Sequence, residues 1–244
     1  MSLSTYCPLD RFVSEIQTAG FAISANVVSD EMLSSVVAEL QHLSTHQSSR
    51  RGQVYAARNL LATANSVVEL ATSPNIRTLV ESTLGVDAFP VRALLFDKVP
   101  GANWNVSWHQ DQVIPVAEQR EVAGFSAWSV KRGVPHVRPP AAVLERMLTL
   151  RVHIDNCNCN NGALQVIPGS HRHGILSDKD IKSIVAGSNP TLCETTRGSV
   201  LAMRPLLLHS SPPAVSPAHR RVIHIEFAVE PLPNGLKWAD WSRL

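Results

Sequence analysis

The sequence has no long apolar run, no excess of charge of one sign and few cysteines. Only 17% of its 244 residues are charged, and the formal net charge is +2. A nucleic-acid-binding domain carries a concentrated basic surface, which this spread of charge does not provide. No apolar run reaches the length of a membrane span, and the first residues lack the basic and apolar regions of a signal peptide. We therefore expect a cytoplasmic protein without nucleic-acid or membrane partners.

The four cysteines, Cys7, Cys157, Cys159 and Cys193, are expected to be free thiols, because a reducing compartment keeps thiols reduced. Cys157 and Cys159 form a C-x-C pair inside an asparagine-rich stretch. Zinc binding by this pair is one interpretation. A structural zinc site normally has a second pair of ligands at a suitable spacing. Since no second pair is visible, we expect a hairpin loop.

Residues 1–85 show mainly the spacing of helices. Apolar residues recur at helical intervals in three stretches, which are 9–16, 33–43 and 66–84. Ser29 or Asp30 can cap the second of these helices, and Pro74 must interrupt the third. A short strand is expected at 20–23, directly after the first helix.

After Gly85 the pattern changes to short apolar or alternating runs that are separated by turn residues. These expected strands are 89–98, 147–154, 163–167, 199–203, 206–210 and 221–229. Such a series is typical of an antiparallel β-sandwich or barrel. Hydrophobic residues make up 44% of the chain, which is enough for a substantial core. We therefore expect a mainly β protein with a helical N-terminal layer.

Two connections in this second half stand out. Asn161 and Gly162 tolerate positive φ and predict a tight hairpin turn between two strands. The stretch 124–140 is basic and contains proline, and its length suits a lid or a substrate loop. Its candidate substrate-contacting residues are Trp128, Lys131 and His136. A cationic loop favours an anionic substrate, although a solvated, flexible loop is the competing interpretation.

His109, Gln110 and Asp111 form the pattern His-x-Asp. On a strand, residues i and i+2 point to the same face, so an imidazole and a carboxylate would converge. His209 ends the apolar run 206–208 and offers a third ligand far along the chain. Two histidines and one carboxylate leave one side of an ion open, as in non-haem iron(II) oxygenases. By itself His-x-Asp is common by chance, and a surface turn is the simpler interpretation.

Arg220 follows His209 at the start of the expected strand 221–229. A buried guanidinium is costly unless it meets a carboxylate, which it can bind through two parallel hydrogen bonds. A dicarboxylate cosubstrate would supply that partner. The alternative is an ordinary solvated strand end. Arg221 alternates to the opposite face and is expected at the surface.

Three blocks of the sequence together resemble the phytanoyl-CoA dioxygenase family of iron(II)- and 2-oxoglutarate-dependent oxygenases. They are the His-x-Asp pattern at 109–111, the stretch N-G-x-L-x-x-x-P-G-S-H at 161–171, and His209 followed by Arg220. The resemblance implies a double-stranded β-helix (a jelly-roll, cupin-like core) with iron at its open end, within one domain at 1–244. Residues 1–85 would form the helical support, residues 86–230 the jelly-roll core with the metal site, and residues 231–244 the C-terminal tail.

The resemblance also implies roles for individual residues. The implied iron ligands are His109, Asp111 and His209, and the implied cosubstrate-binding residues are Arg220, Lys98 and Arg151. Arg220 would hold the distal carboxylate of 2-oxoglutarate. Lys98 could instead be a snorkelling surface lysine, and Arg151 an arginine at the edge of the core. His171 is implied to be structural or near the mouth of the site. His153 and His224 are expected to be hydrogen-bonded strand histidines.

The family chemistry implied by the resemblance consumes dioxygen and 2-oxoglutarate and releases succinate and carbon dioxide. An unactivated C–H bond of a small molecule is hydroxylated or desaturated. Halogenating relatives replace the carboxylate ligand with a small residue, whereas this chain has Asp111, which favours hydroxylation or desaturation. Two other functions remain open. One is a cupin-like metal enzyme that does not use 2-oxoglutarate and has no use for Arg220. The other is a non-catalytic jelly-roll binding protein.

Overall fold

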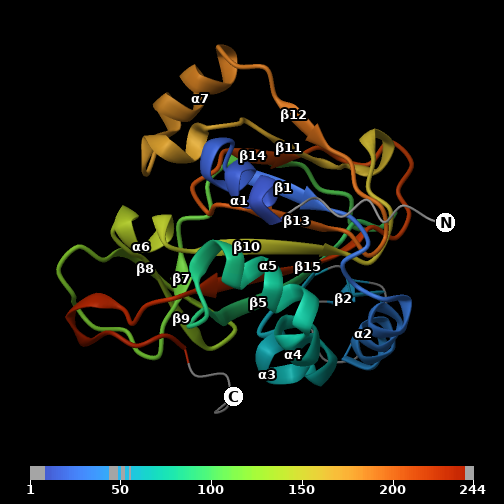
Figure 1. Ribbon diagram of the computed structural model, residues 1–244, viewed down its shortest axis with the longest axis horizontal. Helices are drawn as coiled ribbons and strands as arrows, with labels where there is room; N and C mark the ends of the chain where they lie inside the picture. Colours follow the sequence, from blue (N-terminus) through green and yellow to red (C-terminus); the bar gives the residue numbers. More distant parts are fainter. Residues whose placement is uncertain (1–8, 44–48, 51–52, 55, 240–244) are drawn as a thin grey trace.

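The computed structural model describes residues 9–43, 49–50, 53–54 and 56–239 (Figure 1). Cys7 and residues 240–244 of the expected tail lie outside them. The α-helices are α1 (Leu9–Thr18), α2 (Asp30–Leu43), α3 (Leu60–Thr63), α4 (Asn65–Thr72), α5 (Pro74–Leu84), α6 (Ala141–Glu145) and α7 (Asp178–Ala186). Short 3-10 helices are Cys159–Asn161, Ser170–His173 and Pro233–Gly235. Within the described ranges, no helix has both the length and the apolar content to span a membrane.

Two antiparallel sheets form the jelly-roll core. The order of strands in the large sheet is β1 (Phe21–Ser24), β13 (Val200–Met203), β10 (Leu148–His153), β15 (Arg221–Ala228), β5 (Phe89–Asp97) and β4 (Ala56–Ala57). The order in the small sheet is β12 (Thr191–Cys193), β11 (Leu164–Val166), β14 (His209–Ser211) and β6 (Val106–His109). Neighbouring strands in both sheets pair antiparallel. The predicted mainly β fold with a double-stranded β-helix core is confirmed.

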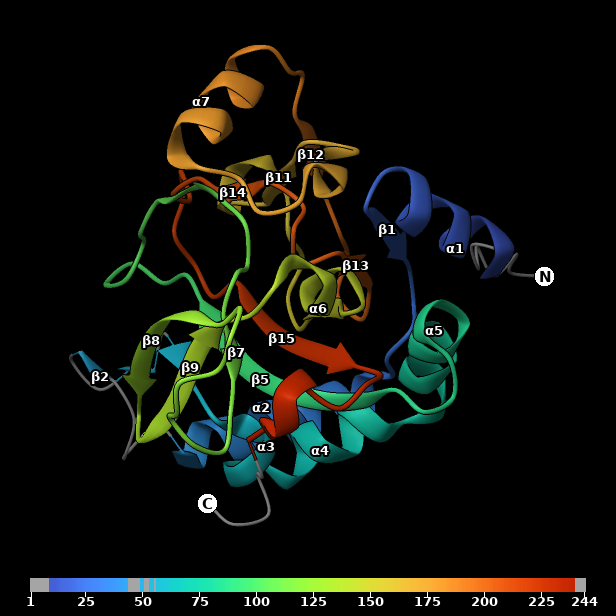
Figure 2. The ribbon, with the colours of Figure 1, turned by 90° about the vertical axis from the view of Figure 1, so that its left-hand side faces the viewer.

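The N-terminal helices cover the outer face of the large sheet, and the small sheet lies on its other side (Figure 2). Alternation along β10 assigns its two faces. Leu150 and Val152 belong to the same buried cluster as Phe12 of α1 and Leu33 of α2. Each such buried side chain stabilises the fold by about 1.5–3 kcal/mol. The predicted helical layer is therefore confirmed, with the predicted break where α5 begins at Pro74.

The inner face of the large sheet is partly apolar and partly charged. Leu201 and Met203 of β13 pack against Leu164 and Val166 of the small sheet. The neighbouring strands β10, β15 and β5 instead place charged or polar side chains on that face, and the buried ones are Arg92, Thr149, Arg151, His153, His224 and Glu226. Burying charge is costly unless it is paired. This part of the interior is therefore built for chemistry and not for packing alone.

The apolar run before His209 is not a strand as expected. Leu206 and Leu207 lie in a buried turn, and β14 begins only at His209. The backbone N–H of Leu207 donates to the carbonyl of Arg204 at 3.0 Å. The backbone N–H of Leu208 donates to the hydroxyl of Ser170 at 2.8 Å. Because Arg204 and Ser170 satisfy these backbone groups, the run can be fully buried without pairing in a sheet.

The predicted hairpin at Asn161 and Gly162 was wrong. β10 and β11, which flank it, belong to different sheets. The side chain of Asn158 accepts from the backbone N–H of Asn160 at 3.0 Å, and Asn161 accepts from the N–H of Asn158 at 2.7 Å. These bonds favour a 3-10 turn. Gly162 does take a positive φ of 79°, and it carries the chain from one sheet to the other.

The C-x-C pair lies in the same connection. Cys157 is buried and Cys159 is exposed, and the cysteines in the described ranges are free. Neither contributes to a possible metal-binding group among the described residues. The expectation of free thiols is confirmed for this pair, but the expected hairpin loop is instead a connection between the two sheets that contains a 3-10 helix at Cys159–Asn161.

The stretch 124–140 is a paired hairpin and not a loop. β8 (Ser126–Lys131) and β9 (Val134–Arg138) pair antiparallel, and β7 (Ile114–Pro115) extends them into a separate small sheet. Arg132 and Gly133 connect the two strands, with φ values of 52° and 80°. Two successive positive φ angles are the geometry of a tight hairpin turn. A two-residue hairpin turn therefore lies at 132–133, where none was predicted.

Candidate metal centre and cosubstrate pocket

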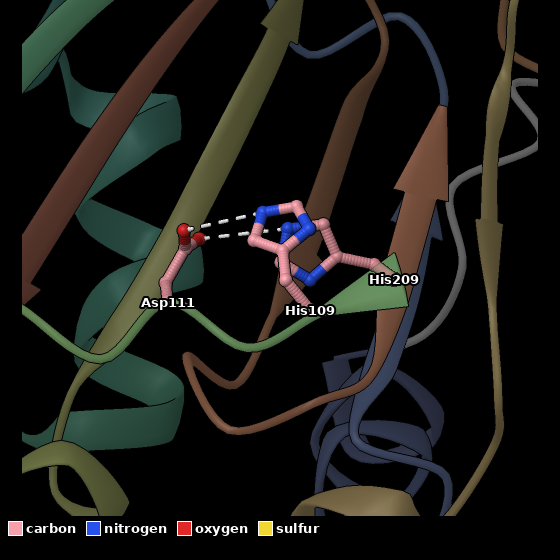
Figure 3. A group of neighbouring side chains, drawn as sticks. All are labelled: His109, Asp111 and His209. Carbon is pink, nitrogen blue, oxygen red and sulfur yellow. Dashed lines mark ion pairs between the residues drawn. The ribbon is translucent and has the colours of Figure 1, made fainter. Parts of the chain in front are cut away.

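His109, Asp111 and His209 meet where β6 and β14 run side by side (Figure 3). His109 ends β6 and lies opposite His209, the first residue of β14. Asp111 follows beyond the end of β6, where its backbone N–H donates to the carbonyl of Pro205 at 2.9 Å. One strand was expected to present both His109 and Asp111, which was wrong. Donor atoms of the three side chains nevertheless lie within 4.8 Å of one another.

The spacing of these donor atoms suits an ion. Nε2 of His109 lies 3.9 Å from Oδ1 of Asp111, and Nε2 of His209 lies 3.7 Å from Oδ2. The two imidazole ring centres are 4.2 Å apart. The two nitrogen–oxygen distances are too long for hydrogen bonds. A divalent ion about 2 Å from each donor would span them.

The tautomers of both histidines follow from their backbone contacts. Nδ1 of His109 lies 2.8 Å from the carbonyl oxygen of Ser107, and Nδ1 of His209 lies 2.9 Å from that of Leu207. Because a carbonyl can only accept, each Nδ1 carries the hydrogen. Each Nε2 therefore presents a lone pair toward Asp111. Backbone carbonyls orient metal-binding histidines in this way.

The electrostatics of Asp111 also suit a cation. Burial raises the pKa of Asp111, but the positive electrostatic surroundings of the site, which include Arg92, hold it below its usual value. Its Oδ2 is buried and has no hydrogen-bond partner among the described residues. Burial lowers the pKa of His209 to about 3, which keeps that imidazole neutral near pH 7. An ionised carboxylate with an unpartnered oxygen beside two Nε2 lone pairs fits a divalent metal.

Gln110 fixes the turn that separates His109 from Asp111. Its side-chain amide donates to the carbonyls of Gly174 and Leu206, both at 2.8 Å. Its amide oxygen accepts from the backbone N–H of Leu176 at 2.9 Å. The buried glutamine therefore ties the His-x-Asp turn to the segment that leads into β14. Such ties hold ligands from distant parts of the chain in one place.

The P-G-S-H motif supports His209 from the other side. The hydroxyl of Ser170 donates to the carbonyl of Ile167 at 2.7 Å and accepts from the N–H of Leu208, directly before His209. His171 packs so closely against Gly20 that a Cβ on this glycine would collide with its ring. His171 is not part of the metal group. The implied structural role of His171 agrees with this packing.

A cavity beside the metal group holds the three expected cosubstrate residues. Lys98, Arg151 and Arg220 all line it, together with the metal group. Side chains that sequence reasoning missed also line it, namely Phe96, Trp104, Val106, Leu164, Ser211 and His224. Phe96 and Lys98 share one face of β5 and its extension, a periodicity that could have identified Phe96.

Arg220 is not a solvated strand end, because it is only 2% exposed. Its Nε and Nη1 have no hydrogen-bond partner within the described ranges. Its backbone N–H donates to Oδ1 of Asp97 at 3.0 Å, and its side chain bonds the thiol of Cys157. Burial lowers the pKa of Arg220 from its usual value, but a guanidinium stays charged. It is a buried cation with two donors left over for an anion.

Lys98 and Arg151 add positive charge to the same cavity. Lys98 is fully buried, and its ammonium donates to the carbonyls of Pro212 and, at 3.2 Å, Ser211. Burial and the nearby Arg220 lower the pKa of Lys98 to about 8. Burial also lowers the pKa of Arg151 to about 10. Lys98 is therefore not a surface lysine.

The candidate substrate residues lie outside this cavity lining. Trp128 packs at the edge of a separate apolar cluster. His136 is buried, and burial lowers its pKa to about 4. Lys131 is half-buried, and burial and the charge of Arg92 lower its pKa, while Asp111 raises it. The role of Trp128, Lys131 and His136 in binding substrate stays a prediction.

His153 and His224 are hydrogen-bonded strand histidines, as expected. Nδ1 of His153 lies 2.8 Å from the hydroxyl of Thr195. Nε2 of His224 lies 3.1 Å from Oε1 of Glu226. Glu226 also binds Arg92 on the neighbouring strand. Sequence reasoning missed Arg92 and Glu226. The alternation of β15, which puts His224 and Glu226 on the face of Arg220, could have identified Glu226.

Comparisons with known proteins agree with this geometry. Residues 16–222 match the phytanoyl-CoA dioxygenase (PhyH) family. The fold resembles AviO1 from Streptomyces viridochromogenes Tue57, with 20% identity, a TM-score of 0.67, and coverage of 96% of this chain and 100% of that chain. A structure of EctD from S. alaskensis with bound Fe has 15% identity, a TM-score of 0.71, and coverage of 95% and 81%.

The fold also resembles the non-heme alpha ketoglutarate dependent epimerase SnoN from nogalamycin biosynthesis. The identity is 14% and the TM-score 0.64, over 96% of this chain and 86% of that chain. A search of curated protein sequences found no match.

Proposed function

The chain belongs to the phytanoyl-CoA dioxygenase family, and from that premise we propose that it is an iron(II)- and 2-oxoglutarate-dependent dioxygenase. Its proposed reaction is hydroxylation or desaturation of an unactivated C–H bond in a small molecule, with succinate and carbon dioxide as co-products. The observation that carries the proposal is the convergence of His109, Asp111 and His209 beside the buried, partly unpartnered guanidinium of Arg220. The cytoplasmic location expected from the sequence stays a prediction.

The proposed division of labour follows from the contacts. Nε2 of His109, Nε2 of His209 and a carboxylate oxygen of Asp111 would hold the metal. When bound, iron(II) supplies activation of dioxygen coupled to decarboxylation of 2-oxoglutarate. Arg220 would bind the distal carboxylate through its free Nε–H and Nη1–H, because paired N–H groups match a carboxylate. Lys98 would add a second positive charge.

The apolar lining of the cavity supports the same proposal. Phe96, Trp104 and Leu164 line the same cavity as the metal group and Arg220. Apolar walls exclude water, which strengthens the attraction between the guanidinium and a carboxylate and protects reactive species from solvent. A cavity that only stored a metal ion would gain nothing from a buried arginine with two unpartnered nitrogens, whose burial is unfavourable until an anion arrives.

The type of oxidation is proposed from Asp111. A carboxylate ligand occupies the position that halogenating relatives leave open for halide, so hydroxylation or desaturation is favoured. SnoN is an epimerase and SnoK a carbocyclase, so product analysis must separate hydroxylation from other oxidative outcomes. The ammonium group of Lys131 favours a substrate with an acidic group, and His136, whose pKa burial lowers to about 4, is a proposed neutral contact. Trp128 is the proposed apolar contact.

Anaerobic addition of iron(II) and 2-oxoglutarate to the metal-free protein tests the proposal. We expect a weak visible absorption band from charge transfer between the metal and the cosubstrate. Substrate-stimulated succinate release should then identify substrates in a metabolite screen. Metal binding without the band would favour a cupin-like enzyme that does not use 2-oxoglutarate. If the protein bound neither the metal nor 2-oxoglutarate, a non-catalytic jelly-roll binding protein would be favoured.

A further inference from the structure

A chain of buried charged side chains runs beside the metal group on the inner face of the large sheet. Arg92 binds Glu226, whose Oε1 also lies 3.1 Å from Nε2 of His224. Nη1 of Arg151 lies 3.1 Å from Nδ1 of the same histidine. All four side chains are buried. Arg92 faces Glu226, and Arg151 faces His224, across neighbouring strands. We call Arg92, Glu226, His224 and Arg151 the inner charge chain.

Stability alone does not account for the inner charge chain. Replacing buried ion pairs with packed apolar side chains is often neutral or stabilising. On the opposite face, β10 and β15 achieve burial with apolar residues such as Leu150 and Ile225. The charged set is instead placed beside Asp111, whose Oδ2 lies 3.9 Å from Nε2 of His224. The position of the inner charge chain beside the metal group indicates a role in organising that group.

The hydrogen on His224 can be assigned from its partners. The guanidinium of Arg151 can only donate, so Nδ1 of His224 must accept. Nε2 of His224 therefore carries the hydrogen and donates to Glu226. This tautomer is the reverse of that in His109 and His209, whose Nε2 atoms present lone pairs.

This tautomer decides between two roles for His224. Donor atoms of Asp111, His224 and Glu226 lie within 4.8 Å of one another and could in principle hold a second ion. However, Nε2 of His224 presents a hydrogen and no lone pair. Glu226 is already neutralised by Arg92. The group is therefore a hydrogen-bond donor placed beside Asp111, and not a second metal seat.

We propose that His224 is a positioning residue for Asp111. When the metal takes one carboxylate oxygen, the other stays in a buried site where an unpartnered oxygen is costly. After a small rotation of the carboxylate, the single hydrogen on Nε2 of His224 would be shared between that oxygen and Glu226 in a bifurcated hydrogen bond, and Glu226 and Arg92 hold the imidazole at that distance. Asp111 then binds through one oxygen, which keeps metal positions open for cosubstrate and dioxygen. This inference rests on the metal centre of the proposed function.

Metal titration of the apo-protein with Co(II) tests the inference without 2-oxoglutarate or dioxygen. His224→Leu removes the donor and should lower Co(II) affinity by about 10–100-fold, the usual effect of losing a group that orients a ligand. The visible Co(II) spectrum should also change, because the carboxylate can then bind through both oxygens. His224→Gln retains an N–H near the position of Nε2 and should restore most of the affinity and the spectrum.

His153→Leu is the matched control. His153 is an equally buried histidine. It lies on β10, on the same face of the large sheet as His224, but it bonds Thr195 and not the metal group. Its loss should leave Co(II) affinity and spectrum as in the wild type. A folded His224→Leu protein with wild-type Co(II) affinity and spectrum would overturn the inference. Binding of two Co(II) ions per chain, with the second lost in His224→Leu, would also overturn it.

A measurement on the wild-type protein covers the case in which His224→Leu does not fold. Nitrogen-15 NMR of labelled histidines in the Zn(II)-loaded protein reports which ring nitrogen carries hydrogen. We expect hydrogen on Nδ1 of His109 and His209, and on Nε2 of His224. Hydrogen on Nδ1 of His224, or Zn(II) on its Nε2, would refute the assignment. If the wild type binds Co(II) but never consumes 2-oxoglutarate, the proposed function fails while these readouts remain decisive.

Discussion

Replacing Arg220 with methionine should separate cosubstrate binding from folding. In most proteins, removal of a buried charged side chain breaks a partnership and destabilises the fold. Arg220 is only 2% exposed, and two of its nitrogens have no partner in the described part of the chain. Removing an uncompensated buried cation takes away an unfavourable burial. We therefore expect Arg220→Met to melt, without ligand, at a temperature no lower than the wild type.

The magnitude of the binding defect follows from the same contact. A buried charge that loses its partner costs about 3–5 kcal/mol, and each 1.4 kcal/mol changes Kd tenfold. Kd for 2-oxoglutarate should therefore rise by about 100- to 1,000-fold or more. A ligand at 100 times its Kd stabilises the folded state by about 2.7 kcal/mol. For a domain of this size, that stabilisation raises Tm by about 5–10 °C.

The assay is thermal melting with Mn(II) as a stand-in metal, with and without 2-oxoglutarate. At the 2-oxoglutarate concentration that raises the Tm of the wild type by about 5–10 °C, the Tm of Arg220→Met should rise by less than about 2 °C. Arg221→Met is the matched control. Arg221 faces the other way and binds Asp155 through Nε at 2.8 Å and Nη2 at 2.7 Å. It should lower Tm modestly yet keep the full shift. A wild-type shift in Arg220→Met would refute the reasoning.

Three further perturbations test other parts of the site. Asp111→Ala should abolish succinate formation with only a modest change in Tm, because the lost carboxylate has an unpartnered buried oxygen; an active variant would contradict its role as a ligand. Burial lowers the pKa of Lys98 to about 8 against an ordinary value of 10.5, so the unfolded chain binds more protons between those values and stability should rise across that window. As Lys98 loses its charge over the same window, 2-oxoglutarate should bind more weakly. Urea unfolding and 2-oxoglutarate binding, each measured at pH 7 and 9.5, should lose these pH dependences in Lys98→Met. Gly162→Ala should cost more than about 1–2 kcal/mol and weaken 2-oxoglutarate binding, because its Cβ would lie 2.5 Å from the carbonyl oxygen of Pro212 and 2.9 Å from Nζ of Lys98. Gly85→Ala, whose Cβ at a φ of +96° would meet nothing within 4 Å, isolates backbone strain, and equal losses in the two variants would argue against the contact with Lys98.

Local periodicity in the sequence was sufficient to predict α1, α2, β1 and the strands β5, β10, β11, β13 and β15, but not β6 to β9, β12, α6 or α7. Alternation in β10, β15 and β5 predicted strands, and the apolar spacing of residues 9–84 predicted helices with a break at Pro74. These predictions succeeded because they depend on side chains a few residues apart. The sequence also identified His109, Asp111, His209 and Arg220 as candidates for one site through their resemblance to a known family, and the structure brings them together.

Wherever two structures suited the same local pattern, the sequence left the choice open. Asn161 and Gly162 permit a hairpin, but local asparagine bonds made a 3-10 turn there, and the hairpin formed at Arg132 and Gly133. The run 206–208 is apolar enough for a strand. It became a buried turn because the hydroxyl of Ser170 satisfied its backbone.

The sequence by itself determined which groups were available and which stretches could form helices and strands. Only the tertiary structure decided which groups meet: His109 opposite His209, Asp111 beyond the strand end, and Arg92 against Glu226. The physical reason is that these contacts join residues about a hundred or more positions apart in the chain. Their distances are set by how whole strands pair and how sheets pack, a property that no local pattern contains.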